Sequence, residues 1–113
     1  MEVSCEKFVP IIEGKLDSKF KKIYIEQYLK EIKKERIKNI ILGCTHYPLL
    51  EEDIKNYLGE VNIINMGTVL ANTIYLKSAV KDLDIYFTDN KKELQDKVST
   101  ILEEKVETKQ LDL

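Results

Sequence analysis

The fold is decided by the stretch Asn39-Ile40-Ile41-Leu42-Gly43-Cys44-Thr45-His46-Tyr47-Pro48-Leu49-Leu50. Its short apolar opening, bounded by charged residues, is typical of a buried strand. Gly43 allows the backbone to turn tightly or to approach a ligand closely. Pro48 suits the first turn of a helix, and the acidic residues at 51–53 suit the positive end of a helix dipole. We therefore predict a strand, a turn and a helix in succession.

The turn carries a thiol, a hydroxyl and an imidazole, on Cys44, Thr45 and His46. Open α/β sheets bind ligands at such strand-to-helix turns. Free N–H groups at the start of a helix hold carboxylates or phosphates and favour the ionised form of a nearby thiol. The position therefore indicates a functional site.

Three other interpretations remain open from the residues alone. Cys44 and His46 could be two ligands of a metal site, although two further ligands would be needed. They could form a nucleophilic pair for acyl transfer, although such close neighbours in sequence often point in different directions. Cys44 could also be an inert buried thiol, the usual role of a lone cysteine in an apolar run.

The remaining pattern alternates helices with short strands, which predicts a parallel sheet flanked by helices in the α/β class. Pro10 argues against a central strand, so residues 1–12 are expected to form a loop or a short edge element. A helix capped by Asp17 or Ser18 should run to about Lys34. Its expected inner face consists of Phe20, Ile23, Tyr24, Tyr28, Leu29 and Ile32.

After the central turn, Gly59 is expected to end the helix that begins near Tyr47. The other expected elements are a strand at 61–65, a helix at about 69–80 capped by Thr68, a strand at 85–88, and a helix to about 105 opened by a capping box of Asn90 and Glu93. The last eight residues are polar and are expected to fray.

Composition limits the function classes. The chain has 113 residues and a net charge of −2, with both signs mixed, which excludes a basic nucleic-acid face and a polybasic membrane patch. Its apolar runs are too short to span a bilayer, and no signal-peptide pattern opens it. With two cysteines, Cys5 and Cys44, and no secreted scaffold, we expect free thiols and a cytoplasmic location.

Three blocks of the sequence resemble glutamate racemases of the Asp/Glu racemase superfamily. The segment at 42–50 resembles the motif around the family's second catalytic cysteine. Ser4-Cys5-Glu6-Lys7-Phe8-Val9-Pro10-Ile11-Ile12-Glu13 resembles another block, usually written with proline at the position of Glu6. Asn62-Ile63-Ile64-Asn65-Met66-Gly67 resembles a later strand and turn, where serine is common in place of Met66. The blocks follow the family's order and approximate spacing.

The resemblance implies the C-terminal portion of a protein in which two α/β domains face each other across the active site. The family's first half carries aspartate-serine-glycine, proline-tyrosine-glycine and cysteine-asparagine-threonine blocks, and none occurs here. We expect residues 1–72 to form part of the second domain and residues 73–113 to form a segment that returns to the first. A missing N-terminal half is then an expected partner. Apolar surface left uncovered, and a strand at 85–88 without its family partners, favour a homo-oligomer or a rearranged tail.

The resemblance also implies an activity, the interconversion of L- and D-glutamate for peptidoglycan synthesis, without cofactor or metal. Cys44 would be the base for the L-enantiomer, His46 would stabilise its thiolate or relay its proton, and Glu13 would orient His46. Gly43, Cys44 and Thr45 would contact the substrate, and Thr45 would offer its hydroxyl and N–H to the substrate's carboxylate. From the residues alone, Glu13 is more simply a solvated loop acid.

Cys5 does not correspond to the family's first catalytic cysteine and is expected to be a small buried residue. The chain alone is expected to be inactive, because racemisation requires a second acid–base group. The alternative function is a non-catalytic, racemase-like interaction domain.

Overall fold

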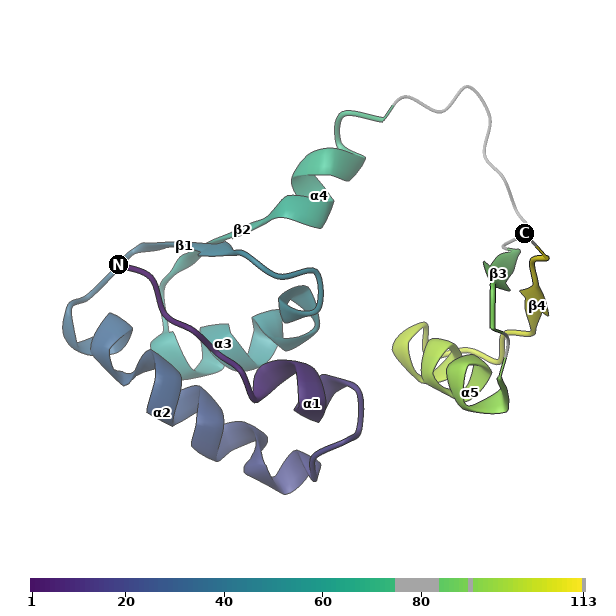
Figure 1. Cartoon of the computed structure of the whole chain (residues 1–113). Coiled ribbons are helices and arrows are strands. Elements are labelled where there is room, and N and C mark those ends of the chain that lie inside the picture. Colours follow the sequence, from purple (N-terminus) through teal and green to yellow (C-terminus); the bar gives the residue numbers. More distant parts are fainter. Residues whose placement is uncertain (75–83, 90, 113) are drawn as a thin grey trace. The chain divides into compact units, whose positions relative to one another are not determined.

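The computed structural model describes residues 1–74, 84–89 and 91–112 (Figure 1). Internal contacts divide the chain into two compact units, Met1–Tyr75 and Leu76–Leu113. Each unit combines helical segments with a pair of parallel strands, so the predicted parallel α/β class is confirmed. Among the described residues, the helices are all too short or too polar to cross a membrane.

The first unit is organised around two parallel strands, β1 (Asn39–Leu42) and β2 (Asn62–Asn65). Both strands were predicted to within one residue. Their register places Leu42 opposite Asn65, so the turn after β1 and the start of the helix after β2 lie at the same edge of the sheet. The helical segments of this unit are α1 (Phe8–Ile12), η1 (Ser18–Phe20), α2 (Lys21–Lys34), η2 (Tyr47–Leu50), α3 (Glu51–Leu58) and α4 (Met66–Ala71).

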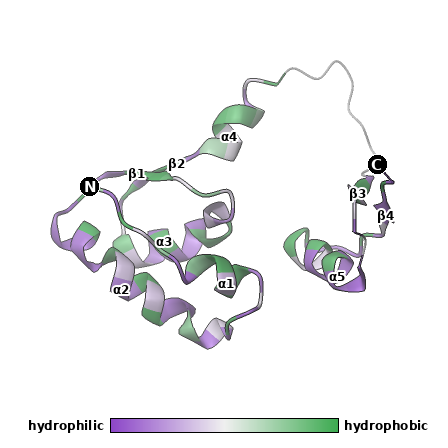
Figure 2. Ribbon diagram, in the orientation of Figure 1, coloured by the Kyte–Doolittle hydropathy of each residue, from purple (hydrophilic) through white to green (hydrophobic). Residues whose placement is uncertain are grey.

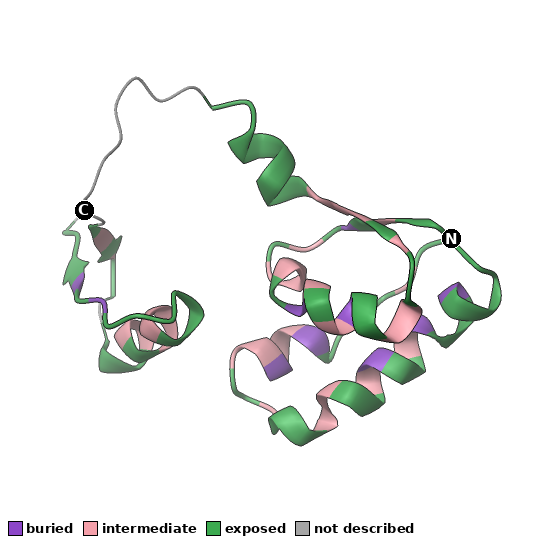
Figure 3. Ribbon diagram, turned by 180° about the vertical axis from the view of Figure 1, so that it is seen from behind, coloured by how far each residue is buried: buried purple, intermediate pink, exposed green. Residues whose placement is uncertain are grey.

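The core of this unit joins α1, α2 and α3 to the end of β1, and Figure 3 marks its buried residues along these helices. Its members are Cys5, Phe8, Ile25, Leu29, Ile32, Leu42, Leu50 and Ile54. The prediction for α2 is correct at Leu29 and Ile32 but wrong at Ile23, which is 56% exposed. Ile25 is buried instead, because positions 25, 29 and 32 fall on one helical stripe.

The N-terminal segment contains a helix that the sequence prediction missed. Pro10 predicts a loop or a short edge element over residues 1–12, whereas α1 spans Phe8–Ile12. Pro10 is the third residue of this helix, within the first turn, where backbone N–H groups have no intrahelical acceptor. The proline, which argues against a central strand, is therefore compatible with a helix at this position.

The helix predicted after the central turn has two parts. A 3₁₀ turn, η2, begins at Tyr47 with Pro48 near its start, and α3 continues from Glu51. The first turn of α3 carries the three predicted acidic residues, and Gly59 follows its last residue with a φ of 83°. Glycine adopts this left-handed conformation without steric cost, so the predicted stop signal is confirmed.

The helix after β2 differs from its prediction. It spans Met66–Ala71, and its cap is Asn65, whose side-chain oxygen accepts hydrogen bonds from the N–H groups of Gly67 and Thr68. The prediction of a Thr68 cap is therefore wrong, and the helix does not continue through 72–74. The rest of the predicted helix, 75–80, lies outside the described residues. Figure 2 shows α4 as largely hydrophobic, yet all its residues are exposed.

The second unit contains β3 (Ile85–Phe87), α5 (Lys92–Ile101) and β4 (Thr108–Gln110). The predicted strand and helix are confirmed, although α5 ends four residues earlier than expected. Lys91 stands at its N-cap, where its side chain makes no capping hydrogen bond, and Asn90 lies outside the described residues. β3 and β4 pair in parallel, with Ile85 opposite Thr108.

The prediction of a frayed C-terminus is wrong for the described residues up to 112. Val106 and Thr108 are both 8% exposed, and β4 supplies β3 with a partner from the same chain. The side chains of α5 hold this segment. Ser99 exchanges hydrogen bonds with the backbone of Val106, and the N–H of Thr108 donates to the side-chain oxygen of Gln95 at 3.1 Å.

Candidate active site

The candidate site lies in the turn that joins β1 to η2. Gly43 leaves the strand, and the turn closes when the N–H of Tyr47 donates to the carbonyl of Cys44 at 3.2 Å. Gly43 does not have a left-handed φ, and a Cβ added to it would meet no atom within 4 Å. The backbone at Gly43 is therefore open, and the turn itself does not require glycine.

The structure brings Cys44 and Thr45 to the same nitrogen of His46. The Sγ atom of Cys44 lies 4.0 Å from Nδ1 of His46, and Oγ1 of Thr45 lies 3.5 Å from that nitrogen. Cys44 is half-buried, whereas Thr45 is exposed. The thiol is therefore accessible and has an imidazole beside it.

The other nitrogen of His46 meets Glu13, which comes from the end of α1. Nε2 of His46 lies 3.1 Å from Oε1 of Glu13. An ionised carboxylate only accepts hydrogen bonds, so Nε2 carries the hydrogen in this contact. In a neutral imidazole, Nδ1 is then an acceptor facing the Cys44 thiol; in the charged form it is a donor to a thiolate.

Lys15 is a second neighbour of the Glu13 carboxylate, and the sequence analysis did not identify it. Its Nζ atom lies 2.6 Å from Oε2 of Glu13. The hydrogen bond from Lys15 is the main cause that lowers the pKa of Glu13, with a smaller contribution from His46. Glu13 is thus kept as an ionised acceptor at neutral pH. A cue in the sequence is Gly14, whose helix-ending position returns the chain toward α1.

Tyr47 connects the turn to the N-terminal segment. Its hydroxyl donates to the carbonyl of Cys5 at 3.3 Å, and its ring packs edge-on against Phe8 with centroids 5.5 Å apart. Burial raises the pKa of the Tyr47 phenol, so it remains a donor. Periodicity alone offers no signal for this contact, which depends on how α1 and η2 pack.

The two cysteines lie in different surroundings. Both are free, as predicted, and Cys5 is buried in the core. Burial raises the pKa of the Cys5 thiol from 9.0 to about 11. Cys5 is therefore a neutral core residue at neutral pH, as expected from the sequence.

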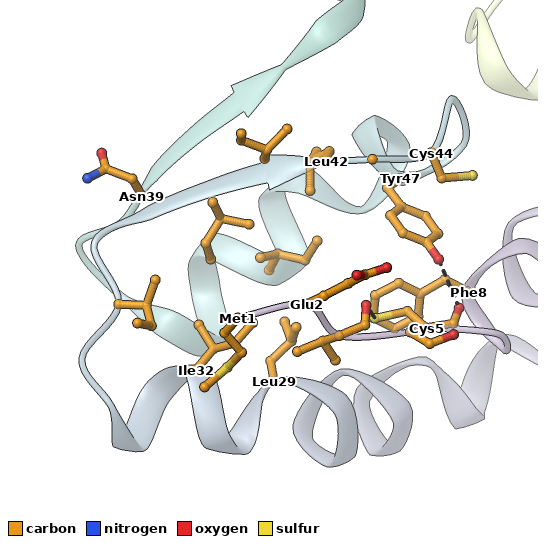
Figure 4. A pocket seen from close by; sticks show the side chains of 17 residues that line it. Met1, Glu2, Cys5, Phe8, Leu29, Ile32, Asn39, Leu42, Cys44 and Tyr47 are labelled. Carbon is orange, nitrogen blue, oxygen red and sulfur yellow. Dashed lines mark hydrogen bonds between the residues drawn. The ribbon is translucent and has the colours of Figure 1, made fainter.

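A cavity of about 520 Å³ is lined by the N-terminal segment, β1 and α2, with Cys44 and Tyr47 at one end (Figure 4). Most of its lining side chains are apolar, and Glu2 is the only charged one. This cavity does not suit an anionic ligand, because its apolar lining would desolvate the charge and the Glu2 carboxylate would repel it. The accessible surface of the turn is the better position for such a ligand.

Metal ligation has no support in the described parts of the chain. Within residues 1–74, 84–89 and 91–112, no group of three or more His, Cys, Asp or Glu side chains is arranged to hold an ion. The contact between Cys44 and His46 thus remains a thiol–imidazole pair there.

Comparison with known proteins places this chain in a family context. No family model matches the chain. It is 40% identical over 112 residues to a glutamate racemase of Aquifex aeolicus, an alignment that covers 94% of this chain and 43% of the relative. The structure of the glutamate racemase isoform RacE1 of Bacillus anthracis matches with a TM-score of 0.73 and 28% identity, over 98% of this chain and 46% of that one.

A second solved structure, the Francisella tularensis glutamate racemase in complex with D-glutamate, matches with a TM-score of 0.64 over 96% of this chain and 44% of that one. Its identity is 22%, so this likeness supports the fold alone. In each comparison the chain spans less than half the length of the relative. The chain is therefore homologous to a portion of glutamate racemase.

Proposed function

We propose that this chain supplies one side of the active site of a glutamate racemase, with Cys44 as an acid–base group. The observation that carries the proposal is a series of side-chain contacts that runs from Cys44 through His46 to Glu13, in a sequence homologous to glutamate racemases. A half-buried thiol beside an imidazole that is itself oriented by a carboxylate is suited to proton transfer.

The proposed chemistry is the transfer of a proton at Cα. The Cys44 thiolate removes the α-proton of L-glutamate, and an acid on the opposite face returns a proton to the carbanion with inverted configuration. The reverse reaction begins with a Cys44 thiol that donates its proton. No redox change occurs, and the step requires neither cofactor nor metal.

The neighbours of Cys44 are assigned supporting roles. His46 stabilises the thiolate through Nδ1 or relays its proton, and Glu13 orients the imidazole. Thr45 is exposed, so its hydroxyl and N–H are available to a substrate carboxylate, next to the open backbone of Gly43. Oriented donors of this kind stabilise the negative charge that develops on the substrate.

The second half of the site is proposed to come from the portion of a racemase that this chain does not match. Residues 1–72 would form part of one domain, and residues 73–113 would complete the other. The whole protein would then make D-glutamate for peptidoglycan in the cytoplasm, where the free thiols of Cys5 and Cys44 persist.

One observation favours the second candidate, a non-catalytic interaction domain. Apolar side chains are exposed on β1 and α4, including Ile41 at 65% and Leu70 at 63%. Exposed apolar surface of this kind marks sites of association. Racemase activity that depends on Cys44 separates the two candidates, because a non-catalytic interaction domain would not contribute a catalytic thiol.

The test combines this chain with the complementary portion of the Aquifex aeolicus relative and follows racemisation of both glutamate enantiomers by circular dichroism. The proposed function predicts activity with the native chain and a loss of about a hundredfold or more in Cys44→Ser. Cys5→Ser is the matched control, since Cys5 is a core residue. Unchanged activity in Cys44→Ser would contradict the assignment and leave the interaction domain as the better candidate.

A further inference from the structure

The two carboxylate oxygens of Glu13 have different partners. Oε1 faces Nε2 of His46 at 3.1 Å, and Oε2 faces Nζ of Lys15 at 2.6 Å. A carboxylate held at one oxygen can rotate about its side-chain bonds, whereas one held at both has a defined orientation. Glu13 is therefore fixed from two sides, although its side chain is 28% exposed.

The backbone places Lys15 where it can reach Glu13. Gly14 has a φ of 72°, and its N–H donates to the carbonyl of Ile11 at 3.1 Å. The N–H of Lys15 donates to the carbonyl of Pro10 at 2.8 Å. These two bonds form a Schellman motif, which ends α1 and returns the chain over its last turn.

The other ionisable groups nearby have different contacts. The second nitrogen of His46 faces Cys44, and the hydroxyl of Tyr47 from η2 donates to a backbone carbonyl. Asp17 and Lys19, which flank the start of η1, pair with each other at 3.3 Å. Lys15 is thus the permanently charged cation that contacts Glu13 in the described part of the chain, consistent with its leading role in lowering the pKa of that carboxyl.

We propose that Lys15 is a positioning residue for the site: it holds Oε2 of Glu13 so that Oε1 accepts the hydrogen bond from His46. This arrangement keeps the hydrogen of a neutral imidazole on Nε2 and presents Nδ1 to Cys44. The functional consequence rests on the proposed function. The contact itself can be measured in the isolated chain without any racemisation.

The experiment uses the single histidine of the chain as a reporter. The ring signals of His46 are followed by NMR from pH 3 to pH 6 in the native chain, Lys15→Gln, Lys15→Arg and Glu13→Gln. Protonation of Glu13 replaces the charged acceptor at Nε2 by a weaker neutral one, so an inflection is expected at acidic pH in the native chain. It should disappear in Glu13→Gln, move to higher pH in Lys15→Gln, and return toward the native position in Lys15→Arg.

A second readout at pH 7 is the nuclear Overhauser effect between the His46 ring and the Glu13 side chain, which should weaken in Lys15→Gln. Lys19→Gln is the matched control, because Lys19 likewise pairs with an acid two residues earlier but does not contact Glu13. Equal behaviour of Lys15→Gln and the native chain, or of Lys15→Gln and Lys19→Gln, would overturn the proposal. Persistence of the inflection in Glu13→Gln would overturn it as well. Racemisation by Cys44→Ser tests the proposed function separately.

Discussion

Nε2 of His46 lies 3.1 Å from Oε1 of Glu13, which is 33 residues earlier in the chain. The contact joins the end of α1 to the turn after β1, two segments that the core packs together through Phe8 and Tyr47. Since Cys44 faces the other ring nitrogen, the imidazole connects a carboxylate to a thiol. The chemistry of the turn therefore depends on correct packing of the N-terminal helix.

The first prediction concerns the reactivity of the two thiols. Cys44 should react with iodoacetamide at pH 7.5 faster than Cys5, whose pKa is raised to about 11 by burial. His46→Ala should slow the reaction of Cys44 by roughly threefold, since partly exposed contacts contribute about 0.2–1 kcal/mol. Mass spectrometry of the digested chain measures both rates. Equal rates for the two thiols, unaffected by His46→Ala, would mean that the turn does not activate Cys44.

The second prediction concerns the core beneath the site. Phe8 is 1% exposed and packs edge-on against Tyr28 and Tyr47. Phe8→Ala should lower the free energy of unfolding of the first unit by about 3–5 kcal/mol, from lost burial and the cavity that remains. Ile23→Ala, at a position that is 56% exposed, should change it by less than about 0.5 kcal/mol. Urea unfolding measures both, and similar losses would mean that the core is placed incorrectly.

The third prediction compares two glycines with equally open surroundings. An added Cβ meets no atom within 4 Å at either Gly14 or Gly43, but only Gly14 of this pair has a left-handed φ, of 72°. Gly14→Ala should therefore lower the free energy of unfolding by about 1 kcal/mol, whereas Gly43→Ala should have little effect on it. Thermal unfolding of the two variants tests this. An equal effect would indicate that backbone conformation at Gly14 is not the cause.

Much of the first unit could be predicted because local signals and packing agree there. The apolar run of β1, the acidic start of α3 and the stop at Gly59 all favour one structure. The prediction failed where one residue has two meanings. Pro10 is a strand breaker but also fits a first helical turn, and Asn65 ends β2 while it caps α4.

The tail and part of the site could not be predicted because their stability comes from contacts distant in sequence. The three residues of β4 are polar and become a strand because β3 and the side chains of α5 supply partners. Likewise, the contact between Glu13 and His46 joins residues 33 positions apart, and only the family resemblance predicts it. Such pairs depend on the fold and leave no periodic signal.

The fourth prediction concerns assembly. Exposed apolar side chains on β1 and α4 should promote association, so we expect a dimer or a larger species in light scattering at high concentration. Leu70→Lys should shift the population toward monomer, because a charge in an apolar contact is unfavourable. Gln27→Lys, which adds the same charge at an exposed position of α2, is the control. A native chain that is monomeric at high concentration would contradict this expectation.

The last prediction concerns what one side of a racemase site can do alone. Cys44, Thr45, His46 and Glu13 all belong to the first unit, and together they provide one thiol for one face of a substrate. A single base can exchange the α-proton with solvent, but inversion requires a proton from the opposite face. The isolated chain should therefore show negligible racemisation of glutamate in D₂O. Its substrate binding should also be weak, since only part of the binding surface is present.

Mass spectrometry for incorporated deuterium and circular dichroism for inversion distinguish these outcomes. Adding the complementary portion of a homologous racemase should produce inversion that is accompanied by deuterium at Cα. Any slow exchange by the chain alone should occur with retained configuration and should disappear in Cys44→Ser, because the same thiolate must remove the proton. Rapid inversion by the chain alone would require a second acid–base group within the 113 residues, and the one-sided site would then be wrong.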